Sequence, residues 1–227
     1  MVKLLHIFYK EWLKTRWYAL FILVVGAAVC IYLYMDVASS FKTTGAFDYT
    51  LRIMYSNPQA NSYRSIMMYF PLVASLFVGL SQFLPEVIDK KIKLTLHLPL
   101  KHNTVLFMMQ SFGVCLLTVI YLAVLTGFFI IGLTFFPAEI NVAFAVSLAP
   151  WFIGGYATYF MITMISMEPN ILRQIIYSAL TYFFVRLFYT GVLHGDTERL
   201  IIPLVLLTVV SGITLFYSIN RFIKGEL

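Results

Sequence analysis

Long apolar runs without charge are the feature of this chain that most constrains its fold. Residues 17–35, 140–167 and 200–220 carry no charged side chain, and residues 103–138 form a longer run of the same kind. A helix needs about 20 apolar residues to cross the hydrocarbon core of a bilayer. The runs therefore predict several membrane-spanning helices.

The composition excludes an ordinary soluble domain. Hydrophobic residues make up 61% of the 227-residue chain and charged residues only 11%, whereas soluble domains carry roughly 25% charged residues. A membrane β-barrel would need segments of about 10 residues with alternating polarity. The runs here are continuous, so they favour helices, whose backbone groups are satisfied within each segment.

The runs predict an all-α, polytopic membrane protein that forms a single transmembrane domain over residues 1–227. One of its expected spans is weaker than the others, because 172–193 contains Arg173 and Arg186. The six expected spans are residues 17–36, 64–84, 104–134, 142–166, 172–193 and 200–220.

The distribution of Lys and Arg predicts the orientation. Six spans place both termini on the same side as the loops 85–103 and 167–172, and that side holds eleven of the 16 Lys and Arg residues, against four on the other side. Lys and Arg accumulate in cytoplasmic loops. Both termini are therefore expected in the cytoplasm, with the chain in the plasma or inner membrane. This asymmetry accounts for the net charge of +6 without a nucleic-acid partner.

Residues 2–16 are amphipathic. Leu4, Leu5, Phe8 and Trp12 recur at helical spacing, and the basic residues lie mainly off that stripe. The pattern predicts a helix lying in the cytoplasmic interface before the first span. The alternative is a group of basic residues that only sets the topology.

Motifs of common catalytic and binding sites are missing from the sequence. It has no Gly-x-x-x-x-Gly-Lys-[Ser/Thr] phosphate loop, so the chain is not expected to hydrolyse ATP itself. His-Glu-x-x-His, Gly-x-Ser-x-Gly and Cys/His clusters at metal spacing are also absent. No catalytic, cofactor-binding or metal-binding residue is therefore predicted.

Polar residues inside the expected spans are few. Gln82 and Gln110 are expected to form hydrogen bonds between helices. Arg186 is the only charged residue well inside a span. One interpretation is that it reaches the outer interface or pairs with an acid such as Glu139. The other is a role in a gate or a substrate site, because intramembrane charges are commonly functional.

A basic segment, Glu86–Lys101, separates two uncharged runs. Pro85 and the acids Glu86 and Asp89 are typical of the start of a helix, and Pro99 ends the segment. The alternating leucines from Leu94 to Leu100 leave an extended second half open. An ordinary amphipathic loop is the alternative interpretation.

This segment resembles one in the membrane subunits of type-2 ABC exporters. In that family an interfacial helix precedes the first span. A cytoplasmic stretch between the second and third spans begins with an acid, runs through basic residues and ends in a leucine-rich part closing on Leu-Pro. Here the stretch runs from Glu86 through Asp89-Lys90-Lys91-Ile92-Lys93 to Leu94-Thr95-Leu96-His97-Leu98-Pro99. The family's usual Gly-Thr pair is replaced, because Leu94 precedes Thr95.

The resemblance implies that the chain is a permease subunit exporting a lipid, peptide or other amphipathic molecule. It would pair with a second copy or a homologous subunit, and cytoplasmic ATPase subunits would bind and hydrolyse ATP, so the chain would need no cofactor of its own. Residues 86–100 would form the coupling helix that contacts the ATPase. The residues implied in coupling are Glu86, Asp89, Lys90, Lys91, Thr95, Leu98 and Pro99.

Two other functions remain open from the sequence. One is a channel or secondary transporter that needs no ATPase, although no internal repeat of the kind common in secondary transporters is seen. The other is a scaffold subunit of a larger membrane complex.

Overall fold

The computed structural model describes residues 2–55, 62–88, 102–168, 170–190 and 197–224. Within these ranges every element is a helix and there is no strand, which confirms the all-α prediction. The helices are α1 (Val2–Thr44), α2 (Ala46–Tyr55), α3 (Ser62–Ile88), α5 (His102–Phe135), α6 (Ala138–Met167), α7 (Ile171–Thr190) and α8 (Thr197–Lys224).

Five of these helices are long and apolar enough to cross a membrane, which confirms a multi-pass membrane protein by length and composition. They are α1, α3, α5, α6 and α7. Helix α8 covers the sixth expected span with 28 residues, but only Leu200–Ile213 of its apolar part belongs to the described side chains. The sixth span therefore stays a prediction.

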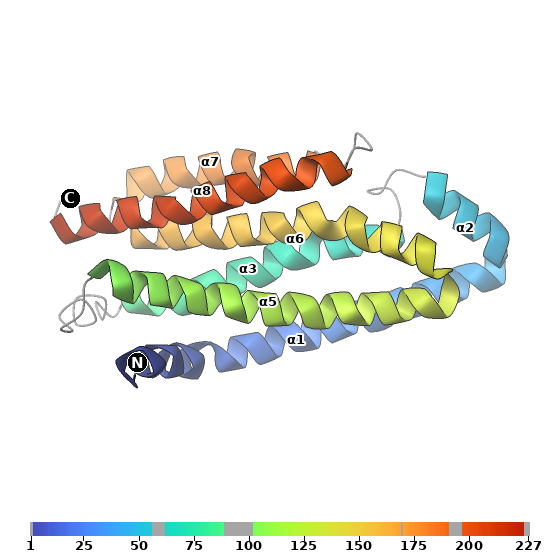
Figure 1. The fold of residues 1–227 in the computed structure, drawn as a ribbon, viewed down its shortest axis with the longest axis horizontal. Coiled ribbons are helices and arrows are strands. Elements are labelled where there is room, and N and C mark those ends of the chain that lie inside the picture. Colours follow the sequence, from blue (N-terminus) through green and yellow to red (C-terminus); the bar gives the residue numbers. More distant parts are fainter. Residues whose placement is uncertain (1, 56–61, 89–101, 169, 191–196, 225–227) are drawn as a thin grey trace.

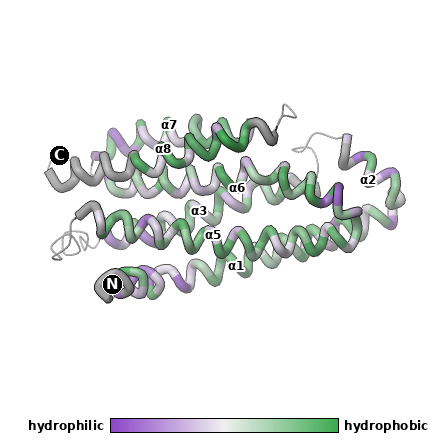
Figure 2. The backbone as a smooth tube through the Cα atoms, viewed as in Figure 1, coloured by the Kyte–Doolittle hydropathy of each residue, from purple (hydrophilic) through white to green (hydrophobic). Residues whose placement is uncertain are grey.

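The long helices lie side by side as an elongated bundle (Figure 1). Helices α1 and α5 begin, and α3, α6 and α8 end, at the same end of the bundle, and α2 lies at the opposite end. Figure 2 shows hydrophobic residues along most of each long helix, with several of the hydrophilic stretches near helix ends. Which end faces the cytoplasm stays a prediction.

Residues 2–16 are helical, as the sequence predicts, and their place in the membrane interface stays a prediction. These residues are the first turns of α1, which runs as one helix from Val2 to Thr44. The sequence has no Pro before Pro58 and no Gly before Gly26, so no residue around Trp17 breaks the helix. The amphipathic turns are therefore joined directly to the first span.

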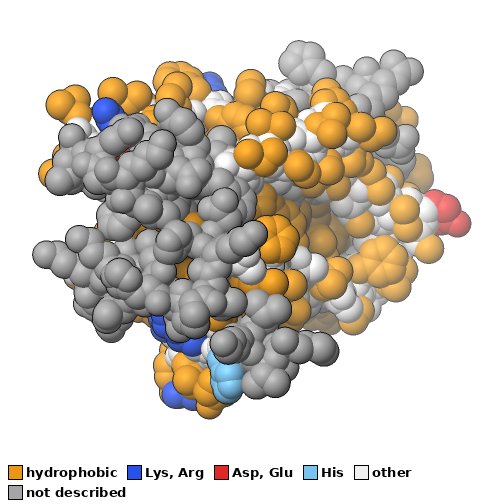
Figure 3. Space-filling view, turned by 60° about the vertical axis from the view of Figure 1, so that its left-hand side comes forward, with side chains coloured by type: hydrophobic (Ala, Val, Ile, Leu, Met, Phe, Trp, Pro, Cys, Tyr) orange, Lys and Arg blue, Asp and Glu red, His pale blue; other side chains and the backbone are white. Residues whose placement is uncertain are grey.

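Helix α6 lies at the centre of the bundle and packs against α3, α5, α7 and α8. Its buried residues include Leu148, Trp151 and Tyr159 and lie on more than one face. A helix that is apolar all round is suited to such a central position. Many large hydrophobic side chains of the outer helices are exposed. On the face drawn in Figure 3, most of the described side chains at the surface are hydrophobic.

Close packing around α6 depends on small residues. A Cβ at Gly155 would collide with the Tyr121 hydroxyl of α5 and lie 3.0 Å from Cβ of Pro71 in α3. That hydroxyl donates a hydrogen bond of 2.9 Å to the Pro71 carbonyl and lies 2.6 Å from Oγ of Ser75. Gly155 thus allows three helices to meet around a buried polar group.

We expect Gly155→Ala to destabilise the bundle by about 1–3 kcal/mol, the range for overpacking a core. The measurement is the temperature at which the detergent-solubilised protein loses its monodisperse elution peak. Gly212→Ala in α8 is the matched control, because its Cβ would make only ordinary contacts of 3.5 Å or more. Equal melting temperatures for the two variants would contradict the packing described here.

Candidate functional site

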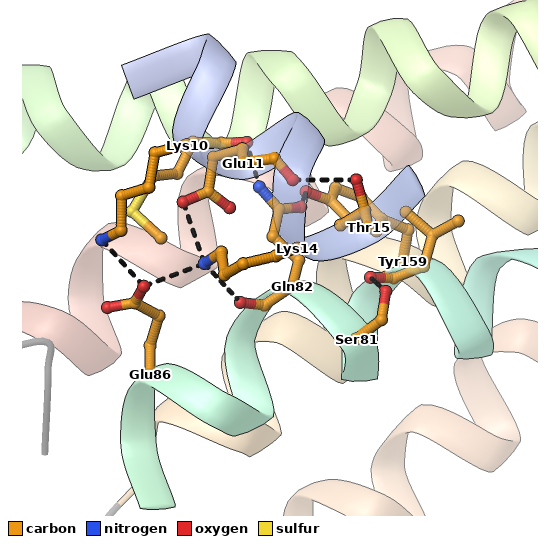
Figure 4. Close-up of polar contacts among 10 residues, drawn as sticks. Lys10, Glu11, Lys14, Thr15, Ser81, Gln82, Glu86 and Tyr159 are labelled. Carbon is orange, nitrogen blue, oxygen red and sulfur yellow. Dashed lines mark hydrogen bonds and ion pairs between the residues drawn. The ribbon is translucent and has the colours of Figure 1, made fainter. Parts of the chain in front are cut away.

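A buried carboxylate joins α1 to the end of α3. Oε1 of Glu86 lies 2.9 Å from Nζ of Lys10 and 2.9 Å from Nζ of Lys14. Glu86 is only 1% exposed. Figure 4 shows the two lysines of α1 directed toward this carboxylate of α3. The contact connects two segments that are 72 residues apart in the sequence.

The spacing along each helix brings these groups together. Lys10 and Lys14 are four residues apart, so they lie on the same face of α1. Glu11, fully buried, adds a contact of 2.9 Å from its Oε1 to Nζ of Lys14. Lys14 also donates to the Gln82 carbonyl at 3.2 Å. We call Lys10, Glu11, Lys14 and Glu86 the ion-pair cluster.

The cluster balances two positive against two negative charges in a largely buried place. The two carboxylates are almost completely covered, whereas the Lys10 side chain is 43% exposed. Taking charges out of water is costly, and removing one partner of a buried pair leaves an uncompensated charge. The cluster is therefore expected to hold α1 against α3 in one arrangement.

A chain of hydrogen bonds continues from the cluster across the bundle. Gln82 Nε2 donates to the Met109 carbonyl of α5 at 2.6 Å, and the Tyr159 hydroxyl of α6 donates to Gln82 Oε1 at 2.8 Å. Gln110 Nε2 of α5 donates to the Gly212 carbonyl of α8 at 3.2 Å. The prediction that Gln82 and Gln110 join helices is confirmed. We call Gln82, Tyr159 and Gln110 the polar chain.

Glu86 does not lie where a separate coupling helix would put it. Pro85 and Glu86 fall inside α3, which ends at Ile88, so neither starts a new helix. Glu86 is buried beside two lysines of α1 rather than exposed on the surface. Its role in coupling stays a prediction. The other expected coupling residues, Asp89, Lys90, Lys91, Thr95, Leu98 and Pro99, lie outside the described residues.

Arg186 lies apart from the ion-pair cluster, on α7, where it borders a cavity between α3, α6 and α7. It forms no ion pair with a described acid, and the expected pair with Glu139 is not among the described contacts. Arg173 of α7, in contrast, lies 3.6 Å from the Glu168 carboxylate that follows α6. The pairing explanation for Arg186 thus lacks a partner among the described residues.

The ion-pair cluster and the polar chain join α1, α3, α5, α6 and α8 through ion pairs and hydrogen bonds. Among the described residues no cluster of three metal-ligating side chains is found. Sequence reasoning missed the pairing of Lys10 and Lys14 with Glu86. A usable signal was present, since four charged residues flank otherwise uncharged runs and buried charges require partners.

Comparisons of the chain with protein-family models, with curated proteins and with solved structures find no match. The functional argument therefore depends on the chain's own residues and their arrangement.

We expect Glu86→Gln to destabilise the protein by about 3 kcal/mol, because it leaves two lysines facing a neutral group in a buried place. Thermal unfolding in detergent measures the change. Glu139→Gln is the matched control, because this acid is exposed at the start of α6, and surface changes cost within about 0.5 kcal/mol. Adding Lys14→Met to Glu86→Gln should cost less than the sum of the single changes. Strict additivity would contradict the pairing.

We expect Tyr159→Phe to destabilise the protein by about 1–3 kcal/mol, because it leaves the buried Gln82 Oε1 without its donor. Tyr32→Phe on the exposed face of α1 is the control. The same unfolding measurement applies, and an unchanged unfolding temperature for Tyr159→Phe would show that the polar chain contributes nothing to stability.

Proposed function

We propose that the chain is the permease subunit of an ATP-binding-cassette transporter that exports an amphipathic molecule. ATP hydrolysis takes place in a separate cytoplasmic partner. The observation that carries the proposal is the ion-pair cluster, because it joins the amphipathic start of α1 to the last turn of α3, directly before the basic segment.

The connection to the ATPase begins at the end of α3. Residues 89–101 follow α3 directly in the sequence, so in this proposal a partner bound there acts on the end of α3 that carries Glu86. The paired Lys10 and Lys14 then move the first turns of α1 in the same direction. A helix is stiff along its axis, and packed elements move as rigid bodies rather than deforming continuously.

The polar chain extends this connection to further helices. Gln82 lies one turn before Glu86 on α3 and bonds to α5 and α6. Gln110 extends the connection from α5 to α8. A displacement at the end of α3 can therefore reach α1, α5, α6 and α8 through these hydrogen bonds. Helix α7 is joined to α3 by the Tyr189 hydroxyl, which donates to the Met68 carbonyl at 3.3 Å, and it also packs on α6. This is the physical requirement for a distant ATPase to alter a membrane pathway.

The exposed apolar faces of the bundle indicate where lipid or a second subunit would make contact. Large apolar side chains are exposed along α1 and α7, for example Trp17, Ile31 and Phe183. Within a membrane these faces contact lipid or a second subunit. The proposal assigns the chain a second copy or a homologous subunit, a location in the plasma or inner membrane, and cytoplasmic termini. The ends of the helices that carry the ion-pair cluster then face the ATPase.

The proposal is tested by purifying the tagged chain from its native membrane and identifying co-purifying ATP-binding proteins. The purified pair is then placed in proteoliposomes and its ATP hydrolysis measured. We expect Lys91→Ala to weaken association with the ATPase without lowering the unfolding temperature of the chain. Glu86→Ala should lower both, because it opens the buried cluster. Lys42→Ala, at the opposite end of α1, is the control for a lost surface charge.

Transport driven by an ion gradient without ATP or an ATPase would contradict the proposal and support a channel or secondary transporter. Loss of another membrane protein's stability on deletion of the chain, without a transport defect, would support a scaffold subunit. Association and ATP turnover unchanged by both Lys91→Ala and Glu86→Ala would show that the coupling assignment is wrong.

A further inference from the structure

A cavity of about 590 Å³ lies between α3, α6 and α7. This volume is within the range of small-molecule sites, about 300–1,000 Å³. Apolar side chains such as Met68, Leu72 and Val185 form much of its wall. Tyr69 and Tyr182 also line it, and both are about 60% exposed. The mouth of the cavity is therefore on the outer surface of the bundle.

That outer surface is the one expected to face lipid. The apolar residues Val73 of α3 and Ile175 of α7, each about one turn from a residue that lines the cavity, are exposed, and α3 and α7 both have the length and hydropathy of membrane spans. A molecule dissolved in the bilayer can therefore enter the cavity without crossing water. A soluble anion would have to cross an apolar face to reach it.

One positive charge borders this apolar cavity. Arg186 is exposed to the cavity, and none of the other lining residues is an acid. It forms no ion pair with any described residue. An unpaired guanidinium at membrane depth costs several kcal/mol, so such residues commonly mark a binding site or pathway. Its planar donors fit a phosphate group with two parallel hydrogen bonds.

A second polar group points to a ligand independently of the charge. Thr181 lines the same cavity one and a half turns before Arg186 on α7. Its hydroxyl is buried, the residue is only 7% exposed, and Oγ1 has no hydrogen-bond partner among the described residues. Buried hydroxyls normally have a partner. A ligand in the cavity would supply an acceptor for Thr181 Oγ1.

We propose that this cavity binds an anionic phospholipid from the surrounding bilayer. The phosphate accepts hydrogen bonds from the Arg186 guanidinium and the Thr181 hydroxyl, and part of an acyl chain lies against Met68, Leu72 and Val185. The inference concerns binding alone and does not depend on an ATPase partner. It can therefore fail while the proposed permease function holds, and the reverse is also true.

The test is equilibrium binding of radiolabelled phosphatidylglycerol and phosphatidylcholine with identical acyl chains to the purified full-length chain in nonionic detergent. We expect saturable binding of phosphatidylglycerol at least tenfold tighter than that of phosphatidylcholine. Arg186→Gln should weaken phosphatidylglycerol binding about ten- to hundredfold, as expected for the loss of a charged hydrogen bond. Arg186→Lys should retain most of the preference, because the charge remains.

Two further variants keep the result interpretable. Arg52→Gln removes an exposed arginine of α2 that does not line the cavity, and it should leave binding unchanged. Thr181→Val keeps the side-chain shape and should weaken phosphatidylglycerol binding by a few-fold. Lipid binding is measured only for variants that elute as a single monodisperse peak. If Arg186→Gln does not fold, Thr181→Val and Arg186→Lys still test the site.

Three results would overturn the proposal. The first is equal affinity for phosphatidylglycerol and phosphatidylcholine in the unmodified chain. The second is unchanged binding in both Arg186→Gln and Thr181→Val. The third is displacement of phosphatidylglycerol by millimolar inorganic phosphate, because the site would then recognise a soluble anion rather than a lipid.

Discussion

The rest of the structure depends on one buried carboxylate. Glu86 lies in the last turn of α3, and its Oε1 is 2.9 Å from the Nζ atoms of two lysines of α1. Only 11% of the residues in the chain are charged. Apolar contacts fix the register of two helices less sharply than a buried charge does, because the hydrophobic effect has no direction. A buried charge has only one satisfactory partner arrangement, so it fixes the register of α1 against α3. The polar chain then extends that fixed arrangement toward α5, α6 and α8.

The two polar features of the bundle differ in kind. At the ion-pair cluster, charges of opposite sign satisfy one another, so the cluster holds helices together. At the cavity beside α7, no acid is among the residues that line it with Arg186, and the Thr181 hydroxyl has no hydrogen-bond partner among the described residues. The first arrangement is closed and structural, whereas the second is open to a ligand. The proposed permease would need both a rigid connection to its ATPase and a place where an amphipathic molecule can bind.

The positions of the long helices could be predicted from the sequence, because uncharged runs have few alternatives in a bilayer. Their ends could not, because a helix does not stop where the membrane does, and α1 continues from Val2 to Thr44. Gln82 and Gln110 were predicted to join helices, since an amide in hydrocarbon needs a partner. The partners themselves were beyond prediction, as was the pairing of Lys14 with Glu86 across 72 residues. Helix α6 is apolar on all sides, so its sequence does not say which face meets which neighbour.

The most direct test of the central claim is hydrogen exchange in the chain alone and in its complex with the co-purified ATPase and nucleotide. The ion-pair cluster joins the start of α1 to the last turn of α3, directly before residues 89–101. Binding of the ATPase should therefore slow exchange of the backbone amides in residues 89–101 and in residues 6–16 together. Protection of residues 89–101 alone, with residues 6–16 unchanged, would contradict the claim that the cluster carries the coupling.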